Sequence, residues 1–519
     1  MYQYIKRDVA VQRDFELQKI TPNCIILASK RLKTSYSEDA FGMSTYLIKH
    51  IVDIIVPYLV ILMNRSRLHG IFPEILKRSV VIPIYKKGDK SLPANYRPIT
   101  LVPIVSKIFE IIIVDQLNEF LNLNKIIHPC QYGFRPGYGT IDAIEKIVGE
   151  IIKNFEEKKI TSVTLLDLSK AFDSVPHHLL VEKLKLYGIR GLSLNIIRTY
   201  LLNRRQAVMV NGRLSGYKTL NRGVPQGSIF GPILFVIFLN DLPKVMSVSP
   251  VLYADDTTLL MGNDNLDTLV ASKNEELNTM IKWFYENDMT INIDKTESIY
   301  FSLKRDIIAK NKSNSIKYLG MYIDCSLNWK IHIQYLISKL SKSIYLIRKL
   351  RSSLSQKYIC MAYHSLFHSQ LNYGILFWGC SVESNLVFLW QKKAIRAILG
   401  LPFLNSCRGM FKKLKIMTVP CMFIYQCLIY INSHKDEFLT GAVVHSYSTR
   451  HNNNLITLKT RLTKTKMSYK SQGVKFYNLL PDSIKNTNTK KFKLMTKELL
   501  INCEGYNLKE IEKFICSVT

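Results

Sequence analysis

The spacing of apolar residues divides the chain into a helical beginning, a middle that contains strands, and a helical remainder. After Pro103 the apolar residues recur at helical intervals, and they are Val105, Ile108, Phe109, Ile112, Ile113, Leu117, Phe120 and Leu121. Short apolar runs at Val80–Ile84 and Ser162–Leu166 predict strands instead. The helical pattern returns from about residue 330. Because strands are expected to dominate only between about residues 160 and 325, the pattern predicts an α+β fold with helical flanks.

Two tight hairpins are predicted within this middle region. Gln206–Val210 is followed by Asn211 and Gly212, a pair that tolerates the positive φ angles of a two-residue hairpin turn. In Val251–Leu260, apolar arms flank two adjacent aspartates. The second hairpin is therefore expected to carry two carboxylates at its tip.

Asp167, Asp255 and Asp256 are candidates for binding a hard divalent cation. Asp167 follows an apolar strand, and the other two occupy the hairpin tip. Mg²⁺ prefers oxygen ligands, typically one or two carboxylates together with substrate phosphates. Two such ions can stabilise the attacking and leaving oxygens of a phosphoryl transfer. An isolated Asp-Asp pair is more often a solvated turn, and the 88 residues between Asp167 and Asp255 do not show that these side chains meet.

The charge of the chain indicates a polyanionic partner. Its 519 residues contain 71 Lys and Arg against 40 Asp and Glu, a formal net charge of +31. The hydrophobic share of 47% excludes a disordered protein. So basic a folded chain favours nucleic acid as the partner over an anionic membrane. The excess is concentrated in residues 301–350, with a net charge of +8, and in residues 450–519, with a net charge of +9.

Other sequence features indicate the cellular compartment and the kinds of site to expect. Ten cysteines occur without a Cys-x-x-Cys pair, which favours a reduced, intracellular compartment over a zinc module. The first twenty residues are charged, so we expect no signal peptide. The apolar stretch Tyr46–Met63 contains Lys49, Asp53 and Pro57 and is interpreted as a buried helix, not a membrane span. His364 and His368 lack an acidic third ligand and are interpreted as packing or surface residues.

Seven short motifs follow one another over about 230 residues. They are Asn95–Ile99, Gln131–Gly137, Leu166–Asp173, Gly223–Ser228, Tyr253–Asp256, Lys295-Thr296 and Tyr318–Gly320. In this order they resemble the motifs of reverse transcriptases from non-LTR (LINE-type) retrotransposons, in particular the jockey-like group. Segments outside the motifs extend the resemblance over most of the chain, and they are Gly70–Asp89, Asn372–Gly379, Gln391–Arg396 and Phe476–Pro481.

The resemblance implies a right-hand polymerase fold. Such a fold has fingers, a palm built on an antiparallel sheet with helices on one face, and a helical thumb. Applied to this chain, it predicts an N-terminal helical extension (1–65) and a reverse transcriptase domain of fingers and palm (66–325). A helical thumb and connection (326–440) and a basic C-terminal extension (441–519) would follow.

The resemblance also assigns catalytic roles. Asp167, Asp255 and Asp256 are implied to bind two Mg²⁺ ions, with Mn²⁺ as an alternative. Lys295 is expected to protonate the leaving pyrophosphate, since a lysine beside phosphates can act as a general acid. Tyr318, Leu319 and Gly320 resemble the primer grip.

Further residues are implied to bind the nucleotide. Arg97 is the main candidate for the triphosphate, because a planar guanidinium fits phosphate oxygens. Arg135 is a weaker candidate, as are Lys86 and Lys87, and solvated charge explains these three equally well.

The nucleotide's sugar and base have candidate partners too. Phe172 is expected under the ribose, where its ring would clash with a 2′-hydroxyl and favour deoxynucleotides. Gln226 and Gly227 lie in a turn whose glycines would let the backbone approach the nucleotide closely.

The predicted function is an RNA-directed DNA polymerase that uses dNTPs, a DNA primer and an RNA template, and that acts in the nucleus without a membrane partner. One alternative stays open, a catalytically silent relic that only binds nucleic acid. An intron maturase or telomerase-like polymerase shares the palm motifs, but the jockey-like closing block argues against it. Complete elements of the group carry an apurinic-type endonuclease, for which 519 residues leave no room. We expect that activity from another chain or a longer form.

Overall fold

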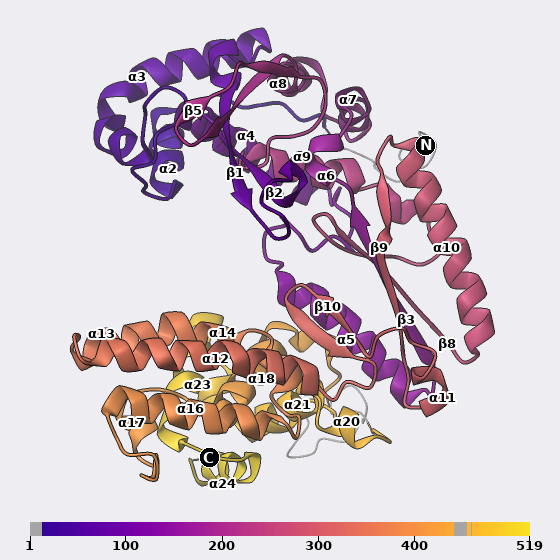
Figure 1. Ribbon diagram of the computed structural model, residues 1–519, viewed down its shortest axis with the longest axis vertical. Coiled ribbons are helices and arrows are strands. Elements are labelled where there is room, and N and C mark those ends of the chain that lie inside the picture. Colours follow the sequence, from indigo (N-terminus) through magenta and orange to yellow (C-terminus); the bar gives the residue numbers. More distant parts are fainter. Residues whose placement is uncertain (1–12, 441–453, 458, 519) are drawn as a thin grey trace. The chain divides into compact units, whose positions relative to one another are not determined.

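The computed structural model describes residues 13–440, 454–457 and 459–518 and divides the chain into two compact units (Figure 1). The first unit consists of Met1–Ala143, Ser162–Met261 and Asp267–Ser298. The second consists of Ile144–Thr161, Gly262–Leu266 and Ile299–Thr519. Helices and strands alternate along the first unit, and the second is mainly helical. The predicted α+β class is confirmed.

The beginning of the first unit is helical, as predicted. Helices α2 (Pro22–Arg31) and α3 (Thr45–His69) pack against each other, and both also contact α4 (Ile104–Leu123). The Ser44 side chain caps α3 by accepting a hydrogen bond from the Leu47 amide. Gly70 ends the helix at a φ of 66°, a left-handed conformation that glycine adopts at little cost.

Helix α3 is long and apolar enough to cross a membrane, and it is the one helix in the described part of the chain that meets this test. Its length and composition alone are weak evidence, because the core helix of a soluble protein passes the same test. Ile48, Val52, Val56, Leu59 and Met63 form a buried stripe along one side of the helix. Pro57 lies within it. However, only 28% of its most apolar window is buried, and Ile54, Tyr58 and Ile61 are exposed, so the interpretation as a buried helix holds for one side of it alone.

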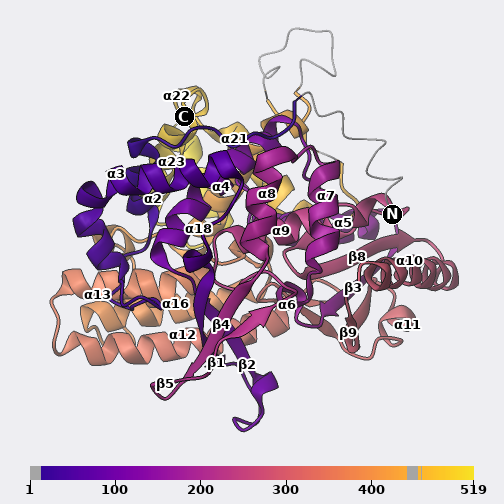
Figure 2. The ribbon, with the colours of Figure 1, turned by 90° about the horizontal axis from the view of Figure 1, so that it is seen from above.

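A five-stranded sheet follows in the order β2-β1-β4-β5, with β6 also paired to β4 (Figure 2). Its strands are β1 (Arg78–Tyr85), β2 (Tyr96–Leu101), β4 (Arg204–Val210), β5 (Arg213–Leu214) and β6 (Lys218–Leu220). Strands β4 and β5 form the hairpin predicted at Asn211 and Gly212, whose φ angles are 50° and 76°. Strand β1 pairs with β2 antiparallel and with β4 parallel.

The expectation that strands dominate only between residues 160 and 325 is wrong. Six α-helices lie inside that range: α6 (Ala171–Ser174), α7 (His177–Leu186), α8 (Gly191–Leu201), α9 (Phe230–Leu239), α10 (Leu266–Glu286) and α11 (Arg305–Ile308). Almost every residue of α9 is buried, so its sequence is apolar on all sides and shows no helical period. Periodicity alone does not separate such a helix from a buried strand.

A second, four-stranded sheet has the order β7-β8-β3-β9. Its strands are β3 (Ile160–Leu168), β7 (Val251–Tyr253), β8 (Asp256–Asn263) and β9 (Ile291–Phe301). The β7–β8 pair is the predicted second hairpin, with Tyr253 opposite Asp256. Asp167 is the penultimate residue of β3, the strand next to β8. The sheet order therefore places Asp167 on the strand next to the hairpin that carries Asp255 and Asp256.

A buried ion pair joins two helical segments of the first unit. Lys183 of α7 places its Nζ atom 2.5 Å from the Oδ1 atom of Asp241 and donates to the carbonyl of Phe238 at 2.7 Å. The indole N–H of Trp283 donates to the other carboxylate oxygen at 3.3 Å. The two charged side chains are only 1% and 2% exposed. Nearly every polar atom of the pair is hydrogen-bonded, as buried charges require.

The second unit begins with helix α5 (Thr140–Glu156), from Ile144 onward, and contains the hairpin of β10 (Ser315–Tyr318) and β11 (Met321–Asp324). Its longer helices are α12 (Lys330–Arg351), α16 (Ser384–Leu399), α18 (Val419–Ser433), α21 (Tyr469–Leu479), α23 (Thr489–Cys503) and α24 (Leu508–Val518). A π-helix at Tyr363–His368 carries the two histidines, whose rings lie 5.1 Å apart.

The shorter helical elements connect these parts of the fold. They are η1 (Glu74–Lys77), η2 (Pro93–Asn95), η3 (Leu242–Lys244), α11 (Arg305–Ile308), α13 (Gln356–Ala362), α14 (Ser369–Asn372), α15 (Ile375–Trp378), α17 (Met410–Lys413), η5 (Lys435–Glu437), α20 (Thr463–Lys466) and α22 (Asp482–Lys485).

The C-terminal helices belong to the core of the second unit. Phe476, Phe492, Leu500 and Ile515 are fully buried, and α18 packs against both α21 and α23. Residues 441–453, 458 and 519 of the predicted C-terminal extension (441–519) lie outside the described residues. The remainder is packed in the way that a domain's own helices are.

Helix α5 is attached to this C-terminal region by a buried acid. Glu145 accepts hydrogen bonds from the hydroxyls of Tyr430 at 3.0 Å and Tyr469 at 2.6 Å, and Lys470 lies at 2.9 Å. Burial acts to raise the pKa of Glu145, but the charge of Lys470 and these hydrogen bonds outweigh it and lower the pKa. The glutamate is therefore held as an anion among its three partners.

Candidate active site

Two sequence motifs meet at the hairpin that carries Asp255 and Asp256. The Leu252 amide donates a hydrogen bond to the Cys130 carbonyl at 2.9 Å, and the Tyr132 amide donates one to the Leu252 carbonyl at 2.8 Å. The Gln131 side chain accepts from the amide of Gly133 at 2.8 Å and from that of Ala254 at 3.3 Å. The motif Gln131–Gly137 thereby holds the turn of the motif Tyr253–Asp256.

The turn leaves no room for a side chain at Gly133. A Cβ atom added there would lie 2.2 Å from the amide nitrogen of Ala254. Ala254 itself has a φ of 57°, which bends the chain sharply between Tyr253 and Asp255. A glycine at residue 133 and a strained residue 254 thus fix where the two carboxylates emerge.

The charge of Asp167 acts on the protonation of the other two predicted acids, Asp255 and Asp256. The side chains of Asp255 and Asp256 reach solvent, yet the protein crowded around them raises both pKa values. The pKa of Asp256 rises to about 6, first through this desolvation and then through the charges of Asp255 and Asp167. Three carboxylates that repel one another in this way form a site suited to a cation.

Three predicted cations surround these acids. The Nζ atom of Lys295, on β9, lies 3.4 Å from the Oδ2 atom of Asp167. Arg97, on β2, lowers the pKa of Asp255 through its charge, and Lys86 does so for Asp255 and Asp256. The structure therefore brings Lys295, Arg97 and Lys86 to the acids from separate strands and turns.

The donor chemistry of this site fits a hard divalent ion. No group of three or more His, Cys, Asp or Glu side chains is arranged as a metal site within the described residues. Mg²⁺ needs fewer protein ligands than that, because it commonly takes one or two carboxylates and completes its shell with phosphates and water. Asp255 and Asp256, with Asp167 on the adjacent strand, would hold such an ion, and its charge would relieve their repulsion.

The predicted sugar-binding residue lies in an aromatic stack. The ring of Phe172 stacks on Phe235 at 4.6 Å between centroids and meets Phe134 edge-on at 6.2 Å. The Phe172 carbonyl accepts a hydrogen bond from the Val224 amide at 2.7 Å, which connects Phe172 to the motif Gly223–Ser228. The ring is therefore held between two motifs and has little freedom to move aside.

The turn at Gln226 and Gly227 connects β2 to the segment that follows β3. The amide of Thr100 donates to the carbonyl of Gln226 at 2.7 Å, and the Gln226 side chain donates to Asp173 at 3.2 Å. Gly227 has a φ of 122°, and a Cβ atom there would lie 2.5 Å from the carbonyl oxygen of Thr100. Only glycine fits this turn without displacing β2.

A buried glutamate behind this turn escaped the sequence interpretation. Glu110 of α4 accepts hydrogen bonds from the amides of Ile229 and Phe230 at 2.8 and 3.3 Å, at the start of α9. Glu110 also accepts hydrogen bonds from the hydroxyl groups of Ser106 and Tyr200. Burial raises its pKa. The available signal was a single acid within the otherwise apolar run of residues 108–114.

Two predicted groups do not contact the acids in the described residues. The guanidinium of Arg135 lies 4.5 Å above the ring of Tyr138. Tyr318–Gly320 forms the turn between β10 and β11, with φ angles of 42° at Leu319 and 87° at Gly320, and the Tyr373 hydroxyl donates to the Leu319 carbonyl. This turn belongs to the second unit, whereas the three acids belong to the first.

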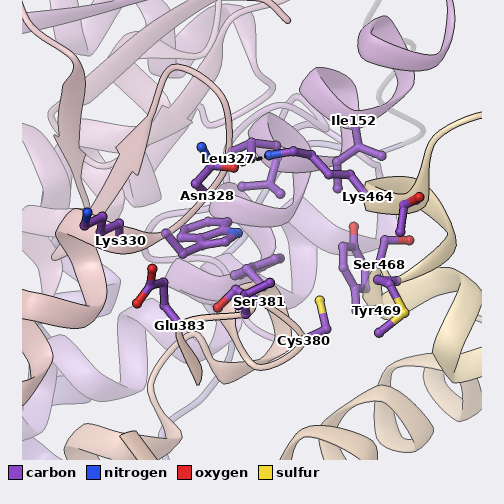
Figure 3. A pocket seen from close by; sticks show the side chains of 16 residues that line it. Ile152, Leu327, Asn328, Lys330, Cys380, Ser381, Glu383, Lys464, Ser468 and Tyr469 are labelled. Atoms are coloured by element: carbon purple, nitrogen blue, oxygen red, sulfur yellow. Dashed lines mark hydrogen bonds between the residues drawn. The ribbon is translucent and has the colours of Figure 1, made fainter. Parts of the chain in front are cut away.

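A separate cavity of about 400 Å³ lies within the second unit (Figure 3). Trp329, Phe377 and Tyr469 contribute aromatic surface to it, and Lys464 and Glu383 contribute charges. The Lys464 ammonium donates a hydrogen bond to the side-chain oxygen of Asn328 at 2.5 Å. None of the predicted catalytic or nucleotide-binding residues lines this cavity.

The chain is similar in sequence to known proteins over most of its length. A family model described as "Reverse transcriptase (RNA-dependent DNA polymerase)" matches residues 84–323. The chain is 28% identical over 453 residues to the RNA-directed DNA polymerase from mobile element jockey of Drosophila melanogaster, covering 81% of this chain and 49% of that protein. It is 26% identical over 445 residues to the probable RNA-directed DNA polymerase from transposon BS of the same fly, covering 79% and 48%.

A third relative, the jockey RNA-directed DNA polymerase of Drosophila funebris, is 27% identical over 416 residues, which cover 75% of this chain and 45% of that protein. The chain thus spans about half the length of the curated relatives it matches. These matches confirm the resemblance that the motifs predicted, and residues 84–323 match the reverse transcriptase family model.

Proposed function

We propose that the chain is an RNA-directed DNA polymerase of a non-LTR retrotransposon. It would transfer nucleotides from dNTPs to the 3′-hydroxyl of a DNA primer on an RNA template. The observation that carries this proposal is that Asp167 lies on the strand next to the hairpin that carries Asp255 and Asp256, with Lys295 at 3.4 Å from Asp167. The proposal includes a two-metal mechanism, with Asp167, Asp255 and Asp256 as the ligands of Mg²⁺ or Mn²⁺.

Each residue of the site would contribute a separate part of the transfer. The bound ions would lower the pKa of the primer hydroxyl and neutralise phosphate charge. Arg97 would bind phosphate oxygens of the nucleotide, with Lys86, Lys87 and Arg135 as weaker contributors. Lys295 would leave Asp167 and donate its proton to the departing pyrophosphate, whose negative charge attracts the ammonium group.

The remaining assignments complete the proposal. The sheet of β3, β7, β8 and β9 would form the palm, and the sheet of β1, β2 and β4 part of the fingers. Residues 326–440 would form the thumb and connection, and residues 441–519 the basic C-terminal extension. Tyr318–Gly320 would hold the primer end. We place the activity in the nucleus and assign the endonuclease step to another chain or a longer form.

A primer-extension assay tests this function. The purified chain is incubated with a DNA primer on an RNA template, the four dNTPs and Mg²⁺, and extended primer is separated by length. We expect extension that requires Mg²⁺ and stops when EDTA is added. Binding of the template–primer without any extension, in Mg²⁺ or Mn²⁺, would favour the silent nucleic-acid-binding relic instead.

The glycine at residue 133 provides a prediction about geometry. Gly133→Ala should lower primer extension about 100-fold, because the new methyl group must push the backbone of Ala254 aside and a misplacement of about 1 Å costs that much. Gly139→Ala is the control, since its Cβ atom would meet only the Asp142 carboxylate at 3.7 Å. Equal activity of the two variants would show that the hairpin position does not matter.

Phe172 provides a prediction about sugar selection. In Phe172→Val the ring that stacks on Phe235 is lost, and a 2′-hydroxyl would find room. We expect the preference for dNTPs over rNTPs to fall at least about tenfold, the size of effect that steric selection in a pocket produces. The measurement is the ratio of kcat/KM for dCTP and CTP. A wild-type enzyme that accepts both sugars equally would contradict the role given to Phe172.

A further inference from the structure

Helices α12 and α16 pack side by side (Figures 1 and 2). Four cationic side chains come together on these two helices. They line a concave site of about 250 Å³ within the second unit. The four are Arg348 and Arg351 from α12 and Lys393 and Arg396 from α16. Ala397, Gly400, Leu401 and Phe403 complete the lining, which includes no acidic residue.

The packing of the two helices sets the position of Arg351. Gly400 ends α16 at a φ of 70°, and a Cβ atom there would lie 1.7 Å from the Nη2 atom of Arg351. The guanidinium therefore occupies the space that a side chain at residue 400 would fill. This close fit holds Arg351 against α16 and toward the other three cations.

Arg396 fixes the loop that follows α16. Its Nε–H donates to the carbonyl of Asn405 at 2.8 Å, and its guanidinium lies 5.8 Å from the centre of the Phe403 ring. Phe403 is nevertheless 68% exposed. An aromatic ring is thus presented to solvent beside a cluster of positive charge, although burial would be favourable for it.

The cluster lacks internal neutralisation. Among the described residues, no ion pair joins Arg348, Arg351, Lys393 or Arg396 to a carboxylate, while other cations of the second unit, such as Lys470 and Lys475, have acidic partners. Four like charges held together raise the energy of the folded chain. An anion with several oxygens would offset that repulsion, and guanidinium groups suit phosphate oxygens.

We propose that this site binds single-stranded RNA. The phosphates of the strand would lie on Arg348, Arg351 and Lys393, and an unpaired base would stack on Phe403. Stacking on an exposed ring requires a base that is free of its complement, which favours a single strand over a duplex. The choice of RNA over DNA rests on the proposed function, in which RNA is the template. The phosphate site itself does not depend on catalysis.

The test measures binding in the absence of chemistry. Fluorescence anisotropy follows a labelled single-stranded RNA oligonucleotide mixed with the full chain in EDTA, without dNTPs, over a range of salt concentrations. The triple variant Arg348→Ala, Arg351→Ala, Lys393→Ala should bind the RNA about 10- to 100-fold more weakly. Its salt slope should be smaller by about 2, because each lost phosphate contact on a single strand contributes about 0.7.

Phe403→Ala tests the stacking contact separately. We expect at least about fivefold weaker binding of single-stranded RNA with an unchanged salt slope, because the ring carries no charge. The matched control for charge is the triple variant Lys412→Ala, Lys413→Ala, Lys490→Ala, which removes the same net charge from exposed positions of the second unit. Its RNA affinity should change less than about threefold.

The outcomes separate this inference from the proposed polymerase. Equal RNA affinity of the two triple variants overturns the site, whatever primer extension shows. Selective loss in the Arg348, Arg351, Lys393 variant supports the site even if the wild-type chain never extends a primer. A duplex of the same sequence that binds as tightly as the single strand overturns the assignment to an unpaired strand. Because the changed residues lie at or near the surface, unaltered thermal unfolding of each variant shows that the fold is retained.

Discussion

Asp255→Asn is expected to abolish Mg²⁺-dependent primer extension, with a loss of at least about 1000-fold. Asparagine keeps the size of the side chain but removes its charge, and the ion that the three acids would hold contributes several kcal/mol to stabilising charge in the transition state. A loss of about 4 kcal/mol corresponds to roughly three orders of magnitude in rate. Single-turnover extension on an RNA template measures the effect without interference from product release.

The same variant should still bind nucleic acid. Removing one negative charge from the site leaves the basic surface intact, so the affinity for template–primer should be unchanged or slightly higher. Asp264→Asn is the matched control, since Asp264 follows the opposite end of β8 and is exposed. Residual extension within tenfold of the wild type would remove Asp255 from the catalytic residues.

Asp241→Ala is expected to lower the free energy of unfolding of the first unit by about 3–5 kcal/mol. The change leaves the Lys183 ammonium buried with only the Phe238 carbonyl as a hydrogen-bond acceptor, and an uncompensated buried charge costs about that much. Urea unfolding measures the loss. Hydrogen exchange of peptides from α7 and α9 then follows the first unit separately from the second.

The pH dependence of this loss has a definite sign. Burial lowers the pKa of Lys183 to about 8 from its ordinary 10.5, although Asp241 raises it. Without Asp241 the pKa of Lys183 in the folded variant falls further. At any pH between this lower folded pKa and 10.5, the unfolded chain binds more protons than the folded chain, so stability rises with pH. The stability of the variant therefore begins to rise at a lower pH than that of the wild type. The penalty is largest in acid and shrinks as the pH approaches about 8.

A double variant provides the control. Lys183→Met with Asp241→Leu replaces the ion pair by apolar groups of similar size, and such replacements are often neutral or stabilising by about 1–4 kcal/mol. We expect the double variant to be more stable than Asp241→Ala alone. A single variant that loses less than about 1 kcal/mol would indicate that water or another group reaches Lys183.

The sequence predicted those parts of the fold that depend on neighbouring residues. Asn211 and Gly212 specify their hairpin through two positive φ angles, and the paired aspartates mark theirs through the apolar arms on either side. The helix after Pro103 follows from its repeated apolar spacing. These features require only local geometry, so a single sequence is sufficient to recognise them.

Contacts between distant residues could not be predicted in the same way. The parallel pairing of β1 with β4 and the contact of Lys295 with Asp167 each join segments more than 100 residues apart. The hydrogen bond from the Ala254 amide to the Gln131 side chain could not be predicted either, although the sequence showed both motifs. The motifs showed which residues matter, and the sheet order shows how β3 and β8 bring them together.

The attachment of helix α5 to the C-terminal helices has a consequence for protein synthesis. Glu145 is separated from Tyr430 by 285 residues and from Tyr469 by 324. At a translation rate of about 5–20 residues per second, the ribosome needs roughly 15 to 65 s to deliver these partners. During that interval α5 lacks the surface that it covers in the finished protein, so the second unit is expected to fold late and to need protection from aggregation while the chain is made.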